Sequence, residues 1–337
     1  MAITASSSGV LIGNAAYPQY SANANSNGSK FIPELWSGKL QVKFYKTTVL
    51  GEITNNDWEG EIKGQGDTVN IRAIPTITIR DYQKGMNLTN EVPVSTPIQL
   101  TIDKGKYFSV VVDDVDAVQA DVKLMDMFTN DASEQMKIAI DGDVLGNAYV
   151  DAAAANKGTT AGAESANINL GTANSAVAVT KDGASTTRAI LDLILDMGQV
   201  LDEQNVPEDG RWLVAPPWFM SLIKRSDLRQ AYLTGDDISV LRNGKVGMID
   251  RFTLYVSNNL KKVADNAGTA SPTTNDDFTG WYIMAGTRDA ISFASQITDV
   301  ETLRAQSTFG NIMRGLNVYG YKVVKPEALV TAYVKKG

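Results

Sequence analysis

The chain contains 337 residues, which is enough for one elaborate domain or two ordinary ones. Its formal charge of -7 and its pI of about 4.8 indicate an acidic surface, which does not suit a protein that clamps nucleic acid over its whole surface. It contains no cysteine and no histidine. Disulfides, thiolate nucleophiles, cysteine or histidine metal sites and Ser-His-Asp catalysis are therefore excluded. An enzyme would depend on carboxylates, lysine, tyrosine or serine alone.

The first 29 residues consist mostly of Ala, Ser, Asn, Gly and Thr and carry no charged side chain. They lack the basic stretch and apolar core of a signal peptide, and no run in the chain approaches the ~18 apolar residues of a membrane helix. We therefore expect a soluble chain that begins with an arm. The arm is either a disordered tail or a segment that orders only against a partner.

A helix is predicted from residue 31 to about Leu50. Pro33 and Glu34 suit a first helical turn, and Trp36, Leu40 and Phe44 recur at helical spacing.

Residues 52–102 have the pattern of strands, with alternating runs at 69–74 and 76–80 and a return run at 97–102. If half of this excursion runs out and half runs back, it reaches up to ~80 Å. A lone two-stranded ribbon is only marginally stable in water. The excursion therefore either folds back on its own domain or lies on another copy of the protein.

A long helix is expected over residues 115–150, where apolar residues recur at three- and four-residue steps without proline. Asp113 and Asp114 resemble N-caps. The helix would be roughly 50 Å long at ~1.5 Å per residue, and Gly142 and Gly146 could bend or end its last turns.

The remaining chain alternates between short strands and helices. Residues 152–187 are rich in small polar residues and predict an exposed, mobile or irregular loop, after which Ser185 caps a helix that stops near 205–207. We expect strands at 107–112, 212–215, 252–256 and 281–285, a helix at 218–225, and paired strands at 316–324 and 328–334. This mixture, with a large antiparallel excursion, predicts an α+β fold.

Two sequence motifs resemble binding loops but are incomplete. Gly64-Gln65-Gly66 lacks the third glycine of a dinucleotide fingerprint. Asp141-Gly142-Asp143 begins like a calcium loop, but the carboxylate series is broken by Leu145 and Gly146.

Adjacent charged residues have ordinary structural explanations. The carboxylate pairs at 113–114, 236–237 and 276–277 suit helix caps and solvated loops better than acid–base catalysis. The basic cluster at 224–229 suits a solvated helix end. We therefore assign no catalytic, cofactor-binding or metal-binding residue.

Several segments together resemble the major capsid proteins of tailed bacteriophages. These segments are FIPELWS (31–37), GQGDTV (64–69), ITIRDY (77–82), LDEQNVPEDGRW (201–212), GMIDRF (247–252), SNN (257–259) and VYGYKVVKP (318–326). They are spread over most of the chain, and none is diagnostic singly. The resemblance implies the α+β Hong Kong 97-type capsid fold, with an N-terminal arm, an extended β loop, a long spine helix, and peripheral and axial domains.

The resemblance also implies domain boundaries. They are an N-terminal arm at 1–33, a helix of the peripheral region at 34–51, the extended β loop at 52–102, the peripheral domain with the spine helix at 103–151 and 299–337, and the axial domain at 152–298. Some relatives of this fold cross-link a loop lysine to a neighbour's asparagine. Candidate lysines are Lys63, Lys84, Lys104 and Lys106, but no motif identifies an acceptor.

The function implied is that of a major capsid protein, a non-enzymatic shell subunit that self-assembles into an icosahedral phage head around double-stranded DNA. Its partners would be itself, in hexamers and pentamers, with portal, scaffolding and decoration proteins and weakly, non-specifically held DNA, without cofactor or membrane. It would be assembled in the host cytoplasm and found in the virion capsid. The alternatives are an encapsulin-like nanocompartment shell, a carboxylate-dependent hydrolase, and a phage tail or adhesin subunit.

Overall fold

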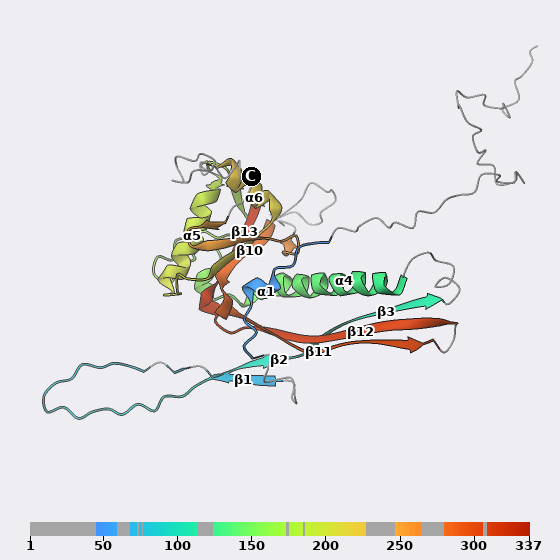
Figure 1. Ribbon diagram of the computed structural model, residues 1–337. Helices are drawn as coiled ribbons and strands as arrows, with labels where there is room; N and C mark the ends of the chain where they lie inside the picture. Colours follow the sequence, from blue (N-terminus) through green and yellow to red (C-terminus); the bar gives the residue numbers. More distant parts are fainter. Residues whose placement is uncertain are drawn as a thin grey trace, which may run out of the picture. The chain divides into compact units, whose positions relative to one another are not determined.

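The computed structural model describes residues 45–58, 68–72, 74–75, 77–113, 124–172, 175–184, 186–226, 247–263, 280–305 and 309–337 (Figure 1). All of them belong to one compact unit, Lys43–Gly337. The expected arm at 1–33 lies outside the described residues, as do residues 31–44 of the first expected helix.

The described residues form three sheets. The smallest pairs β1 (Thr68–Arg72) with β2 (Pro97–Thr101) in antiparallel fashion. A three-stranded antiparallel sheet has the order β11-β12-β3, with β11 at Ile291–Arg304, β12 at Gly310–Val323 and β3 at Lys104–Asp113. Its strands are 10 to 14 residues long, which exceeds the usual length of about 5–6 residues.

The largest sheet has eight strands and runs β5-β4-β13-β10-β6-β8-β7, with β9 also pairing with β10. The strands are β4 (Val177–Thr180), β5 (Arg188–Ala189), β6 (Arg211–Ala215), β7 (Met248–Ile249), β8 (Phe252–Val256), β9 (Lys262–Val263), β10 (Gly280–Thr287) and β13 (Leu329–Lys336). Two helices, α5 (Ile190–Glu203) and α6 (Pro217–Arg225), contribute to the core beside this sheet. Every residue of β6 is buried, as its continuous apolar run indicates.

The long helix α4 occupies Leu124–Asn147, within the range expected for it; residues 115–123 lie outside the described residues. It continues through Gly142 and ends directly after Gly146, and a 3₁₀ turn, η1 (Ala148–Asp151), follows. The helix packs along the three-stranded sheet. At this contact, Tyr319 of β12 donates a hydrogen bond to Asp143 (2.9 Å).

The first helix differs from the prediction. Residues 45–49 are not helical, and α1 spans only Leu50–Ile53, so it begins where the expected helix would end. The carboxylate of Asp141 in α4 accepts hydrogen bonds from the backbone N–H groups of Val49 (3.0 Å) and Leu50 (3.1 Å). A side chain about ninety positions away in the sequence therefore accepts hydrogen bonds from the backbone N–H groups at the start of this helix. Local sequence cannot predict such a contact.

The segment 152–187 is only partly the exposed, irregular loop expected, because it contains the 3₁₀ turn η2 (Ala154–Asn156) and the strand β4. Asn156 is completely buried, and its amide donates to the carbonyls of Glu327 (2.7 Å) and Leu329 (3.0 Å). Leu170 is also completely buried. The small residues allow the chain between η2 and β4 to pack closely against β13 without regular secondary structure.

The expected cap at Ser185 is wrong. Helix α5 begins at Ile190, after the two-residue strand β5, and Ala189 stands at its N-cap without a side-chain hydrogen bond. The predicted end is correct, since α5 ends at Glu203 and Asn205 takes a left-handed φ of 56°.

The strands expected at 107–112, 212–215, 252–256 and 281–285 and the helix expected at 218–225 are confirmed. The strands at 316–324 and 328–334 exist, but they do not pair with each other. Instead, β12 pairs with β11 and β3, whereas β13 pairs with β10 and β4. β11 spans residues on both sides of position 298, and β13 belongs to the same sheet as β4, β6 and β10.

Candidate assembly interface

The segment between β1 and β2 is exposed at every residue from 77 to 96. Its outer loop, residues 77–96, contains no assigned strand, so the expected strand at 76–80 is not formed as a ladder. The preceding Pro75 has no N–H group to donate to a ladder. Thr78 instead donates its backbone N–H and its hydroxyl to the carboxylate of Glu91, at 3.3 and 3.4 Å.

The tip of the outer loop is a tight turn. Met86 donates its N–H to the carbonyl of Gln83 (3.1 Å), and Gly85 takes a φ of +89°. A positive φ at the third residue of such a turn favours glycine, because a Cβ would clash there. The sequence Lys84-Gly85 therefore suits a defined reversal of the chain.

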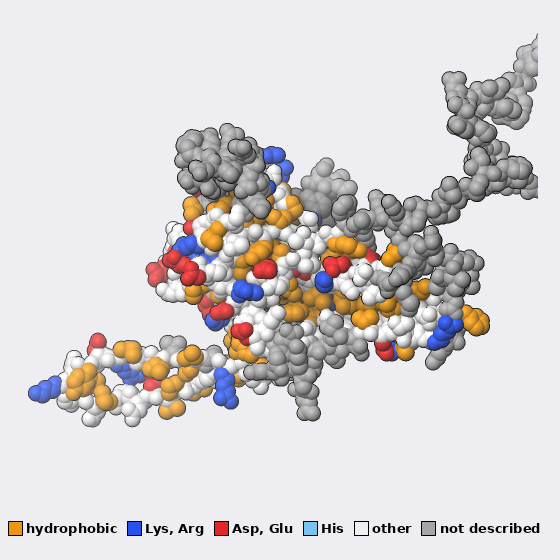
Figure 2. Space-filling model, in the orientation of Figure 1, with side chains coloured by type: hydrophobic (Ala, Val, Ile, Leu, Met, Phe, Trp, Pro, Cys, Tyr) orange, Lys and Arg blue, Asp and Glu red, His pale blue; other side chains and the backbone are white. Residues whose placement is uncertain are grey.

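Large apolar side chains are exposed along the outer loop. In Figure 2, orange side chains lie along the loop at the lower left, which extends from β1 and β2 in Figure 1. The exposed set is Ile74, which precedes the outer loop, and Ile77, Ile79, Tyr82, Met86, Leu88, Val92 and Val94 within it. Contiguous exposed apolar surface of this kind marks a site of interaction with another molecule.

The base of the loop is anchored on its own chain. Ile71 of β1 and Leu100 of β2 are buried in a small apolar cluster with Ala294 and Val324. A Cβ on Gly320 of β12 would lie 2.2 Å from the carbonyl oxygen of Thr101. Glycine at this position therefore permits the backbones of β2 and β12 to approach closely.

The two carboxylates of the calcium-like motif bind protein groups. Asp141 is 1% exposed and accepts hydrogen bonds from Val49, Leu50 and the amide of Asn259 (2.7 Å). Burial raises its pKa, although these hydrogen bonds favour the ionised form. Asp143 accepts from Tyr319, whose pKa is raised by burial and by this hydrogen bond. The carboxylates of this motif therefore link α4 to three distant segments of the chain.

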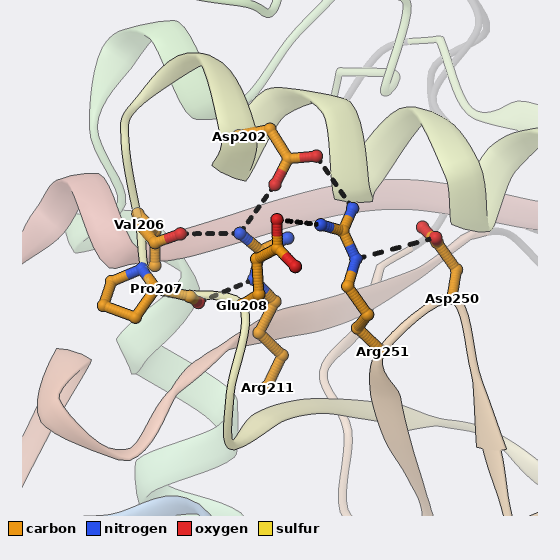
Figure 3. Close-up of polar contacts among 7 residues, drawn as sticks. All are labelled: Asp202, Val206, Pro207, Glu208, Arg211, Asp250 and Arg251. Carbon is orange, nitrogen blue, oxygen red and sulfur yellow. Dashed lines mark hydrogen bonds and ion pairs between the residues drawn. The ribbon is translucent and has the colours of Figure 1, made fainter.

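A second polar cluster joins two of the segments that carry the family resemblance, 201–212 and 247–252 (Figure 3). Asp202 at the end of α5 accepts from Arg211 (2.7 Å) and from Arg251 (2.8 Å). The Arg211 side chain is fully buried and also donates to the carbonyls of Val206 and Pro207. Partial burial of Asp202 opposes its ionisation, but hydrogen bonds and charge from both arginines lower its pKa.

The turn between β7 and β8 supplies the second arginine. Asp250 and Arg251 have φ angles of 46° and 67°, which is costly for residues other than glycine. Ion pairs of Arg251 with Asp202 and Glu208 hold this turn in place. A Cβ on Gly198 of α5 would lie 2.4 Å from the Asp250 carboxylate, so this glycine allows the turn to pack on the helix.

The remaining sequence motifs do not assemble into a chemical site in the described structure. Residues 64–66, 236–237 and 276–277 lie outside the described residues. Asp113 ends β3, and the described part of the basic cluster forms the last turn of α6 and the following cap. Among the described residues, no group of three or more potential ligands is placed to bind a metal ion, and no helix is long and apolar enough to cross a membrane.

A family model and several solved structures match this chain. A model of the family described as phage capsid protein matches residues 95–332, which is more than half of the chain. No curated protein matches the sequence.

Several solved capsid structures have a similar fold. The structure titled "Mycobacterium phage Che8" is 27% identical, with a TM-score of 0.69, and the match covers 90% of this chain and 97% of that chain. The mature capsid of bacteriophage PhiM1 is 15% identical, with a TM-score of 0.64 and coverage of 90% and 92%. The capsid of a native GTA particle is 11% identical, with a TM-score of 0.64 and coverage of 94% and 99%. These matches give no support to the nanocompartment, hydrolase or tail-subunit alternatives.

Proposed function

The chain belongs to the phage capsid protein family and is a major capsid shell subunit, and from this premise we propose how it assembles. Copies associate as hexamers and pentamers into an icosahedral head that encloses double-stranded DNA. The N-terminal arm and the outer loop of each copy lie on neighbouring copies. Many weak contacts then act together at high effective concentration.

The observation that carries this proposal is the state of the outer loop. Its large apolar side chains are exposed, whereas its base at Ile71 and Leu100 is buried in its own chain. Burying apolar surface contributes roughly 25 cal/mol per Å², so a surface provided by another copy would stabilise the loop. The buried base supplies a firm attachment from which the loop can engage that copy.

We further propose that the two larger sheets belong to different domains. The three-stranded sheet with α4 forms the peripheral domain, and the eight-stranded sheet with α5 and α6 forms the axial domain.

The protein acts without catalysis or cofactor, and it meets portal, scaffolding and decoration proteins during assembly in the host cytoplasm. Its charge of -7 suits a container that holds DNA through weak and non-specific contacts.

Deleting the arm or the tip of the loop tests this assembly mechanism. We expect variants lacking residues 1–29 or residues 81–92 to keep the circular dichroism spectrum and the cooperative unfolding of the full chain, because residues 81–92 are exposed and residues 1–29 consist mostly of small polar residues. Both should lose the ability to form closed particles in electron micrographs. Normal particles from both deletions would contradict the mechanism.

A further inference from the structure

The pairing of β1 with β2 ends at Arg72 and Pro97, but the same register, continued outward, accounts for the hydrogen bonds that span the outer loop. Thr68 faces Thr101, and each step along β1 is a step back along β2, so that Arg72 faces Pro97. Continuing at the same rate, Thr78 faces Glu91 and Gln83 faces Met86. The hydrogen bonds of Thr78 to Glu91 and of Met86 to Gln83 join these same partners.

In an extended chain, as in a strand, successive residues point to opposite sides, so this continued register divides the side chains of the loop between two faces. Ile71 and Leu100, which are buried at the base, belong to one face. The same face continues outward through Ile77, Ile79, Met86, Leu88, Val92 and Val94. We call these six residues the apolar face of the loop. The opposite face carries Ile74, Thr78, Arg80, Tyr82 and Glu91.

The apolar face is covered at its base and uncovered beyond it. Ile71 is 8% exposed and Leu100 is 0% exposed, whereas Ile79 is 90% exposed. An uncovered continuation of a buried face requires a further apolar surface. Among the described residues on this face of the loop, the charged one is Asp81. Because Asp81 is acidic, the face does not suit a phosphate-bearing partner.

The chain itself displays a second exposed apolar surface of the required kind. On the three-stranded sheet, Met313 and Tyr319 contact α4, so the even-numbered residues of β12 point away from that helix. This outer sheet face carries Tyr107 and Leu316, which are paired, and Val111 and Leu303, which both pair with Ile312. Tyr107 is 79% exposed and Val111 is 55% exposed.

We propose that the apolar face of the loop packs on the outer sheet face of a second copy, while the opposite face of the loop remains toward solvent. This rests on the proposed shell function and adds which residues meet. Face-to-face packing of pleated surfaces buries alternate side chains of both partners. The charge of the chain and the apolar character of both surfaces favour another copy over nucleic acid as the occupant.

Two isoleucines of nearly equal exposure provide a matched test. Ile79 lies on the apolar face, and Ile74, which is 95% exposed, lies on the opposite face. An Ile79→Asp substitution would place a charge in the contact, and burying an unpaired charge is costly. We therefore expect particle yield on a sucrose gradient to fall at least about tenfold, which corresponds to about 1.4 kcal/mol. Ile74→Asp should stay within about twofold of the parent.

Photo-crosslinking identifies the surface that is met. A benzophenone amino acid is introduced at position 79 or at position 74, and unlabelled and ¹⁵N-labelled subunits are mixed before assembly. We expect position 79 to give cross-links between differently labelled chains, mapping to residues 105–111 or 312–316, and position 74 to give few. Cross-links confined to one chain, links to another surface, or equal links from both positions would overturn the proposal. If the parent chain forms particles and the two aspartate variants give equal yields, the proposal is overturned while the shell function stands.

Discussion

At the scale of single residues, glycines set how closely separate strands approach. Gly320 faces the backbone of β2, and an added Cβ would meet both Thr101 and Ile102. We expect Gly320→Ala to cost about 1–3 kcal/mol of unfolding free energy through overpacking, measured by urea denaturation. Gly105 lies in the same sheet, and a Cβ added there would meet nothing within 4 Å, so Gly105→Ala is the control and should change little. Equal effects of both variants would contradict this explanation.

In the Asp202 cluster, replacing Asp202 is expected to destabilise the fold more than replacing Glu208. Asp202→Asn removes the charge partner of the buried Arg211 and of Arg251, and we expect a loss of about 1–3 kcal/mol in unfolding free energy. Glu208 pairs only with Arg251 among the contacts described and is 70% exposed, so Glu208→Gln should cost at most about 1 kcal/mol. The reverse order in thermal or urea denaturation would refute the role given to Asp202.

The lowered pKa of Glu203 predicts that the stability of the fold depends on pH. Partial burial opposes its ionisation, but hydrogen bonds from Glu164, Gln199 and Ser165 lower its pKa from 4.5 to about 2. Because the folded-state pKa is the lower one, its ionisation stabilises the fold above pH 4.5, and this contribution is lost as the pH falls toward 2.

The expected result for Glu203→Gln is therefore a deficit in the urea midpoint at pH 7 that shrinks as the pH is lowered through this window. Glu134→Gln is the control, because that carboxylate pairs with exposed Lys137 on α4. A deficit for Glu203→Gln that is independent of pH would rule out the ionised carboxylate as its cause.

At the scale of elements, sequence patterns predict what local chemistry determines. The apolar run of β6 and the helical period of α4 indicate their type and approximate bounds. Three features depend on distant residues and could not be predicted. Asp141 caps α1, β12 and β13 join different sheets, and Asn156 buries an irregular segment against the carbonyls of Glu327 and Leu329.

The candidate interface was only partly predictable for the same reason. The length and apolar alternation of residues 69–80 indicate a segment in need of support. Its division into two faces required the observed pairing of β1 with β2 and the turn at Lys84-Gly85. The cluster around Asp202 was missed, because the residues of 201–212 and 247–252 become neighbours only in the folded chain.

The loop register can be tested by engineered disulfides, and the natural chain has no cysteine that would interfere. Thr78 and Glu91 are opposite each other, so Thr78→Cys with Glu91→Cys should oxidise readily, since directly opposed strand residues have Cβ atoms about 4.5–5.5 Å apart. Thr78→Cys with Asn90→Cys is the control one residue out of register and should oxidise at least about tenfold more slowly. Equal rates in a thiol-quenched time course would show that the register does not extend past Pro75.

At the scale of the whole molecule, the chain combines a well-packed core with a loop whose apolar side chains remain uncovered. A stable monomer would be expected to bury such residues, whereas a subunit of a closed shell leaves them for its neighbours. Membership of the phage capsid protein family and the uncovered loop therefore lead to the same account.

Negative-stain microscopy of the purified full chain, combined with its sedimentation, tests this account most directly. The account predicts closed particles in the megadalton range or discrete hexamers and pentamers, with the outer loop protected from proteolysis in the assembled species. A single monomeric or dimeric species at every concentration, with the outer loop equally protected, would contradict it.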